Sequence, residues 1–111
     1  IGKHVVNALK ETHHGVITLD NGWYASMDIA TTITRPLAPI KGLDAVIHLA
    51  AIANPRECDS NPSGAFDVNV NGTHQVLKMA LESGAKKVVF ASSAHVYGIS
   101  PKFLPTTSLT P

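Results

Sequence analysis

The 111-residue sequence is poor in several residue types: it has one cysteine, 5% aromatic residues, 15% charged residues and a formal net charge of +1. With Cys58 alone, no internal disulfide can form, and we expect a reducing, cytoplasmic compartment. The small net charge, without blocks of like charge, gives no electrostatic basis for binding nucleic acid or a membrane surface. No apolar run reaches the roughly 18 residues of a membrane span.

Two further absences concern metals and the ends of the chain. None of the six histidines has zinc-ligand spacing to a second His or to Cys58, so we predict no metal site. Ile1 is followed neither by the basic region nor by the apolar region of a signal peptide. Because the first residue is not Met, we expect a fragment, and its length allows one domain at most.

What is present is an alternation of helix-like and strand-like patterns, which predicts an α/β fold with a parallel sheet and right-handed crossovers. The expected elements are a helix over 1–10 stopped at Gly15, strands over 16–19 and 25–29, a broken helix over 31–41, a strand over 44–51, a loop over 52–61, a long helix ending at Gly84, a strand over 88–91 and a C-terminal loop. Asn61 is predicted to cap the long helix, with Pro62 in its first turn. The expected core face of that helix consists of Phe66, Val70, Thr73, Leu77 and Leu81.

The segment from Lys86 to Gly98, KKVVFASSAHVYG, carries the strongest functional signal. Its apolar run lacks polar alternation, which is typical of a parallel strand covered by helices on both faces. Ser92 and Ser93 then fall at the carboxyl end of that strand, where open α/β sheets bind ligands. The structural alternative is that both hydroxyls merely cap backbone groups in a serine turn.

Small or polar residues also end the other predicted strands. Each of these residues has a ligand-binding interpretation and a purely structural one. Asp20 can accept hydrogen bonds from both hydroxyls of an adenosine ribose and repel a 2′-phosphate, or it can simply form a turn. Ala50 and Ala51 would let a cofactor approach the backbone, or allow tight strand–helix packing. His48 is expected to be a satisfied structural histidine. Asn69 lies in a helix interior that disfavours Asn and Gly, which marks either a functional site or close packing.

The order and spacing of these segments resemble one family, the extended short-chain dehydrogenase/reductases, or NAD-dependent epimerase/dehydratases. The matching segments are Ile1-Gly2 (the end of a Gly-x-x-Gly-x-x-Gly turn), Asp20, Asp28-Ile29, His48-Leu49-Ala50-Ala51, Asn69-Val70-Asn71-Gly72-Thr73 and Ser92-Ser93-Ala94-His95-Val96-Tyr97-Gly98. The resemblance covers nearly the whole chain and is specific for the family rather than for a substrate. It implies a doubly wound parallel sheet, that is, a Rossmann-type NAD-binding domain over residues 1–111, truncated at both ends.

The resemblance also implies roles for individual residues. Ser93 would be the catalytic hydroxyl, hydrogen-bonded to the substrate oxygen at the carbon that gives up hydride. NAD, preferred over NADP because of the carboxylate at position 20, would be bound by Gly2, Asp20, Asp28, Ile29, Leu49, Ala50, Ala51 and Asn69. The family's base is the Tyr of a Tyr-x-x-x-Lys motif. Tyr97 is not that residue, since Pro101 stands where the Lys would be. The base is therefore expected beyond Pro111, just as the first strand is expected before Ile1.

The function implied by the resemblance is that of an NAD-dependent sugar-nucleotide epimerase, which acts by transient hydride transfer at a sugar carbon. UDP-hexose 4-epimerases are nearest in motif, whereas Ala94 and His95 replace the Asp-Glu pair of sugar-nucleotide dehydratases and argue against that branch. Two alternatives stay open: an NAD-dependent sugar or uronate dehydrogenase or reductase, and a catalytically inactive NAD-binding regulatory module. The implied partner is a nucleotide-sugar or sugar substrate. A homodimer is left open, and the fragment alone is expected to be inactive.

Overall fold

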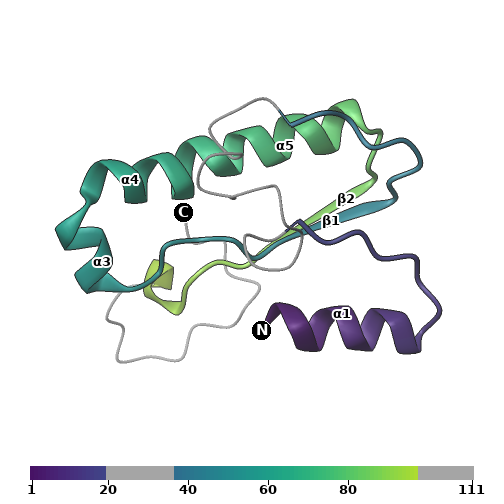
Figure 1. Ribbon diagram of the computed structural model, residues 1–111, viewed down its shortest axis with the longest axis horizontal. Helices are drawn as coiled ribbons and strands as arrows, with labels where there is room; N and C mark the ends of the chain where they lie inside the picture. The colour runs from purple at the N-terminus through teal and green to yellow at the C-terminus, as the bar shows by residue number, and fades with distance from the viewer. Residues whose placement is uncertain (20–36, 98–111) are drawn as a thin grey trace.

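The computed structural model describes residues 1–19 and 37–97. Within these residues, the sheet consists of two parallel strands. β1 (Ala45–His48) pairs with β2 (Lys87–Phe90) in the register that sets Ala45 opposite Lys87 and His48 opposite Phe90. Parallel strands need a long crossover connection, and here it is helical; Figure 1 shows its longest part as a rod alongside the strands. The strands expected over 44–51 and 88–91 are present as this parallel pair, but β1 is shorter than predicted, because residues 49–51 lie beyond its end.

In the part of the chain that the structure describes, six helical segments accompany this pair. They are α1 (Gly2–Glu11), α3 (Pro55–Ser60), α4 (Pro62–Phe66), the π-helix η1 (Asp67–Gly72), α5 (Thr73–Glu82) and the 3-10 helix η2 (Ala94–Tyr97). The segments α4, η1 and α5 follow one another without a break and form the predicted long helix. Gly84, with a φ of 74°, ends it as expected, because a glycine adopts the left-handed conformation without steric cost.

The end of α1 differs from the prediction, because the left-handed residue is His13 (φ 63°) and not Gly15. The N–H of His13 donates to the carbonyl of Lys10, and the N–H of His14 donates to the carbonyl of Leu9, both at 3.0 Å. These two bonds form a Schellman closure, which satisfies carbonyls that the helix end would leave unpaired. The predicted stop at Gly15 is therefore wrong by two residues.

Residues 52–61 were expected to form a loop, but they contain α3. The side chain of Asn54 accepts a hydrogen bond from the N–H of Arg56 at 3.1 Å, and Pro55 occupies the first turn. Seven residues later the same arrangement starts α4, where Asn61 accepts from the N–H of Gly64 at 3.0 Å. An Asn-Pro pair thus starts both helices, because the amide oxygen caps a free N–H and proline already has helical φ.

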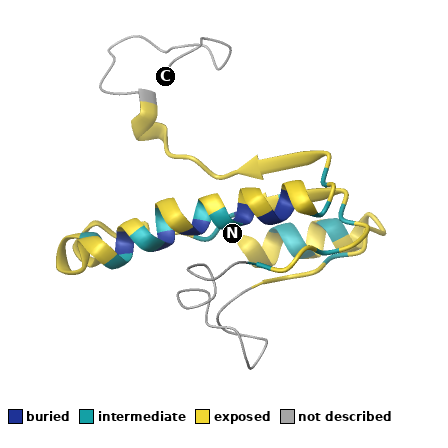
Figure 2. Cartoon of the chain, turned by 90° about the horizontal axis from the view of Figure 1, so that it is seen from above, coloured by how far each residue is buried: buried dark blue, intermediate teal, exposed yellow. Residues whose placement is uncertain are grey.

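The buried face of the long helix is not the one predicted from its large apolar residues. Its buried side chains are Ala65, Val68, Val76, Met79 and Ala80. Four of the five predicted core residues are instead exposed, with Phe66 at 58%, Val70 at 49%, Leu77 at 47% and Leu81 at 80%. Figure 2 shows the buried positions spaced along the long helical segment. α5 packs on β1, and its buried side chains are Val76, Met79 and Ala80. Thr73, the fifth predicted core residue, is half-buried, so the predicted core face is wrong.

Two strand predictions also need correction. Residues 16–19 form no strand, and Ile17 is 65% exposed. A strand is stabilised through a neighbouring strand, and within the described ranges β1 and β2 pair only with each other. β2 was expected to be covered on both faces, yet Val88, Val89 and Phe90 are exposed, because α5 packs on β1 rather than on β2.

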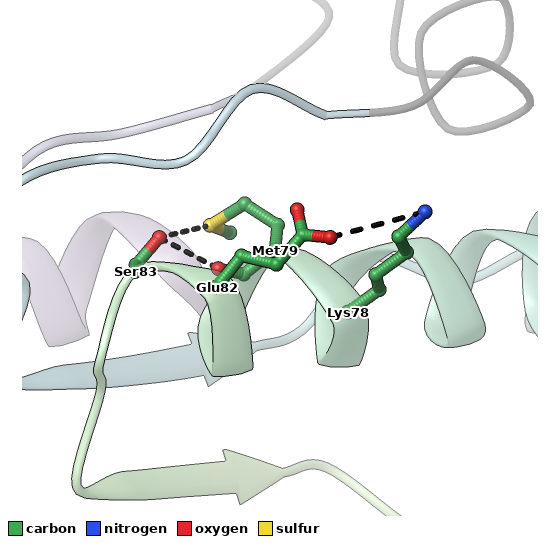
Figure 3. Close-up of polar contacts among 4 residues, drawn as sticks. All are labelled: Lys78, Met79, Glu82 and Ser83. Carbon is green, nitrogen blue, oxygen red and sulfur yellow. Dashed lines mark hydrogen bonds and ion pairs between the residues drawn. The ribbon is translucent and has the colours of Figure 1, made fainter.

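The C-terminal end of α5 is tied to the segment that leads into β1. The hydroxyl of Ser83 lies 2.6 Å from the carbonyl oxygen of Met79 and accepts a hydrogen bond from the N–H of Ile40 at 2.9 Å. In the same last turns of α5, the exposed side chains of Lys78 and Glu82 form an ion pair at 3.9 Å, which Figure 3 shows beside the serine contact. Ser83 therefore links two segments, whereas the ion pair stays within one helix.

Several predictions lie outside the described residues. They are Asp20, Asp28 and Ile29, the strand over 25–29, most of the broken helix over 31–41, and the loop over 99–111. Among the helices that are described, none is long and apolar enough to cross a membrane.

Candidate functional site

The carboxyl ends of β1 and β2 meet at one edge of the sheet. The register sets His48 opposite Phe90, and the N–H of Ala91 donates to the carbonyl of His48 at 3.1 Å. Leu49, Ala50 and Ala51 therefore leave the sheet beside the segment that carries Ser92 and Ser93. The structure thus brings together the small residues after one strand and the hydroxyls after the other, as the sequence pattern predicted.

Ser93 begins the short helix η2 and is exposed at this edge. Its Oγ lies 3.0 Å from Nδ1 of His95 and accepts a hydrogen bond from the backbone N–H of His95 at 3.2 Å. Its carbonyl accepts from the N–H of Val96 at 3.2 Å. The serine turn considered as a structural alternative is present, and the same hydroxyl is also accessible at the ligand-binding edge.

Asn69 holds the segment that follows β1. Its Oδ1 accepts from the N–H of Ile52 at 2.8 Å, and its Nδ2 donates to the carbonyl of Ile52 at 2.9 Å. The thiol of Cys58 lies 3.4 Å from the same carbonyl. Asn69 sits in η1, and π-helical turns are frequent at functional sites. The amide therefore fixes the backbone directly after Ala51, which supports a positioning role at this edge.

His48 joins the strand to the long helix. Its Nε2 lies 3.1 Å from Oγ1 of Thr73, and that hydroxyl donates to the carbonyl of Asn69 at 2.7 Å. Because a hydroxyl has a single hydrogen, Thr73 must accept from His48, so the neutral imidazole carries its hydrogen on Nε2. The imidazole is 5% exposed and its ring lies 5.6 Å from that of Phe90. The predicted structural histidine is confirmed.

Burial gives His48 a lowered pKa, because desolvation penalises the charged imidazolium. Protonation would add a hydrogen on Nδ1, and no described residue is hydrogen-bonded to that atom. His48 therefore acts as a neutral structural link near neutral pH, and not as an acid or base.

Gly2 lies at the start of α1, away from the contacts just described. In both views α1 begins near the middle of the molecule, where the N-terminus is marked (Figures 1 and 2). Apart from its chain neighbours and the backbone of its own helix, no heavy atom lies within 4 Å of the position that a Cβ on Gly2 would occupy. Open space at a helix start suits the close approach of an anionic group. The described side chains contain no group of three or more His, Cys, Asp or Glu residues that could hold a metal ion.

Sequence reasoning missed two members of this edge. Thr73 was expected only as a core residue, yet it links His48 to Asn69. His95 was used only to separate branches of a family, yet it contacts Ser93 twice. The spacing Ser-x-His, with a hydroxyl able to start a 3-10 turn, was the available signal for the second contact.

Comparisons with known proteins agree with this arrangement. The sequence model of the NAD dependent epimerase/dehydratase family matches residues 1–111. The chain is 34% identical, over 88% of its length, to a UDP-glucose 4-epimerase of Halalkalibacterium halodurans, and 30% identical, over 100% of its length, to a UDP-glucose 4-epimerase of Neisseria meningitidis serogroup C. It is also 32% identical, over 88% of its length, to a UDP-N-acetyl-alpha-D-glucosaminuronate decarboxylase of Bacillus cytotoxicus.

The chain spans 33%, 39% and 35% of the length of these three relatives, respectively. No solved structure gives a significant match. The family model nevertheless covers the whole chain, and the parallel strands and crossover helices agree with the family's Rossmann-type α/β fold. The chain therefore belongs to the NAD-dependent epimerase/dehydratase family, whose cofactor is NAD.

Proposed function

We propose that residues 1–111 form part of the NAD-binding Rossmann domain of a nucleotide-sugar epimerase. The observation that carries the proposal is the shared carboxyl edge of β1 and β2, where the exposed hydroxyl of Ser93 stands beside the small residues Ala50 and Ala51. The UDP-glucose 4-epimerases among the relatives favour this reaction over others of the family. The first strand and the substrate-binding region would belong to the remainder of such an enzyme, and its compartment would be the cytoplasm.

The described residues at this edge fit NAD. Gly2 leaves space at the start of α1, and Leu49, Ala50 and Ala51 present a backbone with small side chains after β1. Asn69 holds that backbone in place through Ile52. When bound, NAD supplies the acceptor for a hydride from the sugar. Asp20, Asp28 and Ile29 are proposed to complete the adenosine side, with Asp20 selecting NAD over NADP.

Ser93 is proposed to hold the reacting oxygen of the sugar. A hydroxyl at the carboxyl end of a strand can donate a hydrogen bond to that oxygen while its lone pairs accept from neighbours. The proton of the sugar hydroxyl would go to the tyrosine that is expected beyond Pro111. A fixed donor at the place where charge develops lowers the barrier most when it is already oriented before reaction.

The test is an activity assay of the full-length protein that carries this sequence, with UDP-galactose as substrate. We expect interconversion with UDP-glucose, and Ser93→Ala should lower kcat by about 100-fold or more, because one positioned hydrogen-bonding group is lost. Bound NAD should remain unchanged. Ser92→Ala is the matched control and should retain most of the activity. Full activity of Ser93→Ala, combined with an inactive Ser92→Ala, would show that the wrong hydroxyl was chosen.

The same assay separates the alternatives. Net accumulation of reduced cofactor with a sugar or uronate substrate would indicate a dehydrogenase or reductase. Tight NAD binding without turnover of any nucleotide sugar would indicate a regulatory module. The relative that acts as a decarboxylase shows that the family includes more than epimerases.

A further inference from the structure

Ser93 makes two contacts to a single residue, His95. One joins Ser93 Oγ to the backbone N–H of His95 at 3.2 Å, and the other joins the same oxygen to Nδ1 of the imidazole at 3.0 Å. Both lie within hydrogen-bonding distance. The turn of η2 creates this pair, because it folds the residue two positions after the serine back over the hydroxyl.

The hydrogen-bonding capacity of a hydroxyl makes the state of Nδ1 decisive. Serine has one hydrogen to donate and two lone pairs that accept. The backbone N–H of His95 occupies one lone pair. If Nδ1 carries a hydrogen, it occupies the second lone pair, and the hydrogen of Ser93 is free for a third partner. If Nδ1 is bare, it takes the hydrogen of Ser93, and the hydroxyl can no longer donate to a substrate.

We propose that His95 is a positioning residue that sets the direction of the Ser93 hydroxyl. With a hydrogen on Nδ1, the imidazole and its own backbone N–H together aim the hydrogen of Ser93 at the reacting oxygen of the sugar. Without a hydrogen on Nδ1, the imidazole accepts the hydrogen bond of Ser93, and the hydroxyl no longer donates to the sugar. This inference rests on the proposed function, because it assumes that Ser93 donates to the substrate.

The direction of the Ser93 hydroxyl depends on the imidazole of His95 and on no charged neighbour among the described residues. Within residues 1–19 and 37–97, no Asp, Glu, Lys or Arg forms an ion pair with His95. The direction of the Ser93 hydrogen is therefore set by whether Nδ1 of His95 carries a hydrogen.

The test compares His95→Ala and His95→Asn in the full-length enzyme, with UDP-galactose as substrate. Asparagine places a non-titrating N–H donor close to the position of Nδ1, whereas alanine places none. We expect His95→Ala to lower kcat about tenfold, the scale of one orienting hydrogen bond. KM for UDP-galactose and the NAD content should stay within about twofold, because Ser93 acts on the reacting oxygen rather than on overall binding. His95→Asn should recover most of the lost kcat.

Rescue by asparagine distinguishes positioning from a structural effect. A structural role would be lost in both variants, whereas a positioning role needs only the N–H donor that asparagine restores. His74→Asn, the same change on the exposed face of α5, is the control and should keep the wild-type kcat. Wild-type kcat in His95→Ala, or a kcat of His95→Asn as low as that of His95→Ala, would overturn the role of His95. Full activity of Ser93→Ala would instead overturn the proposed function.

Discussion

At the scale of single residues, His48 shows how one buried polar side chain can join three parts of the fold. His48 lies in β1 and is uncharged. Its Nε2 donates a hydrogen bond to the hydroxyl of Thr73, and that hydroxyl donates to the carbonyl of Asn69. Asn69 in turn holds Ile52 through both atoms of its amide. The hydrogen bonds of His48 Nε2, Thr73 Oγ1 and the Asn69 amide make the burial of these atoms tolerable.

The lowered pKa of His48 predicts a pH-dependent stability. The unfolded chain takes up a proton below the ordinary value of 6.5, while the folded protein resists protonation until a lower pH. The unfolded state therefore binds more protons in that window, so stability should fall as pH drops below about 6.5 and level off below the folded pKa. Denaturant midpoints of the full-length protein at about pH 7.5 and about pH 5.5 measure this loss.

The variant His48→Gln should show a smaller loss of stability between these two pH values, whatever its stability at the higher pH. The matched control is His74→Gln, which removes an exposed imidazole from α5 and should keep the wild-type loss. An equal pH dependence in wild type and His48→Gln would contradict the lowered pKa as the source.

At the scale of elements, the contacts at the end of α5 should differ sharply in energetic value. Ser83 accepts from the N–H of Ile40 in a half-buried setting, so Ser83→Ala leaves a backbone donor without its partner and should cost about 1–3 kcal/mol. Lys78→Gln breaks an exposed ion pair within the helix and should cost no more than about 0.5 kcal/mol. Urea denaturation of the full-length protein measures both, and equal losses would contradict the link between α5 and β1.

Element types were predictable where local chemistry decides them. The Asn61-Pro62 start, the Gly84 end and the apolar runs of both strands follow from capping, left-handed backbone and strand periodicity. The Asn54-Pro55 start carries the same signal, and α3 could have been predicted from it. These features need no information from distant parts of the chain.

Features that depend on tertiary contacts were not predictable. On α5, which packs on β1, Ala80 and Met79 are buried and the apolar Leu77 and Leu81 are exposed. The six-residue π segment η1 also breaks the α-helical period from which a face would be extrapolated. The strand expected over 16–19 needs a partner strand, and pairing is not readable from its own residues.

At the scale of the whole molecule, the described residues bury little apolar surface. The buried hydrophobic residues are small or medium in size, and none of the large side chains is less than 2% exposed. A core of this kind stabilises a chain of such size only weakly. The same consideration supports the expectation that residues 1–111 are inactive by themselves, so the full-length protein is the sample for measurements of activity and stability.

In the proposed function, Ser93 and NAD act together at the carboxyl edge of the sheet to epimerise a nucleotide sugar. This function is tested by supplying the full-length protein with UDP-galactose that carries deuterium at carbon 4 and following the label by NMR. We expect UDP-glucose that retains the deuterium at the same carbon, with no net reduced cofactor, and Ser93→Ala should form it about 100-fold more slowly. Deuterium lost to solvent, or accumulating in free reduced cofactor, would show that the proposed reaction is wrong.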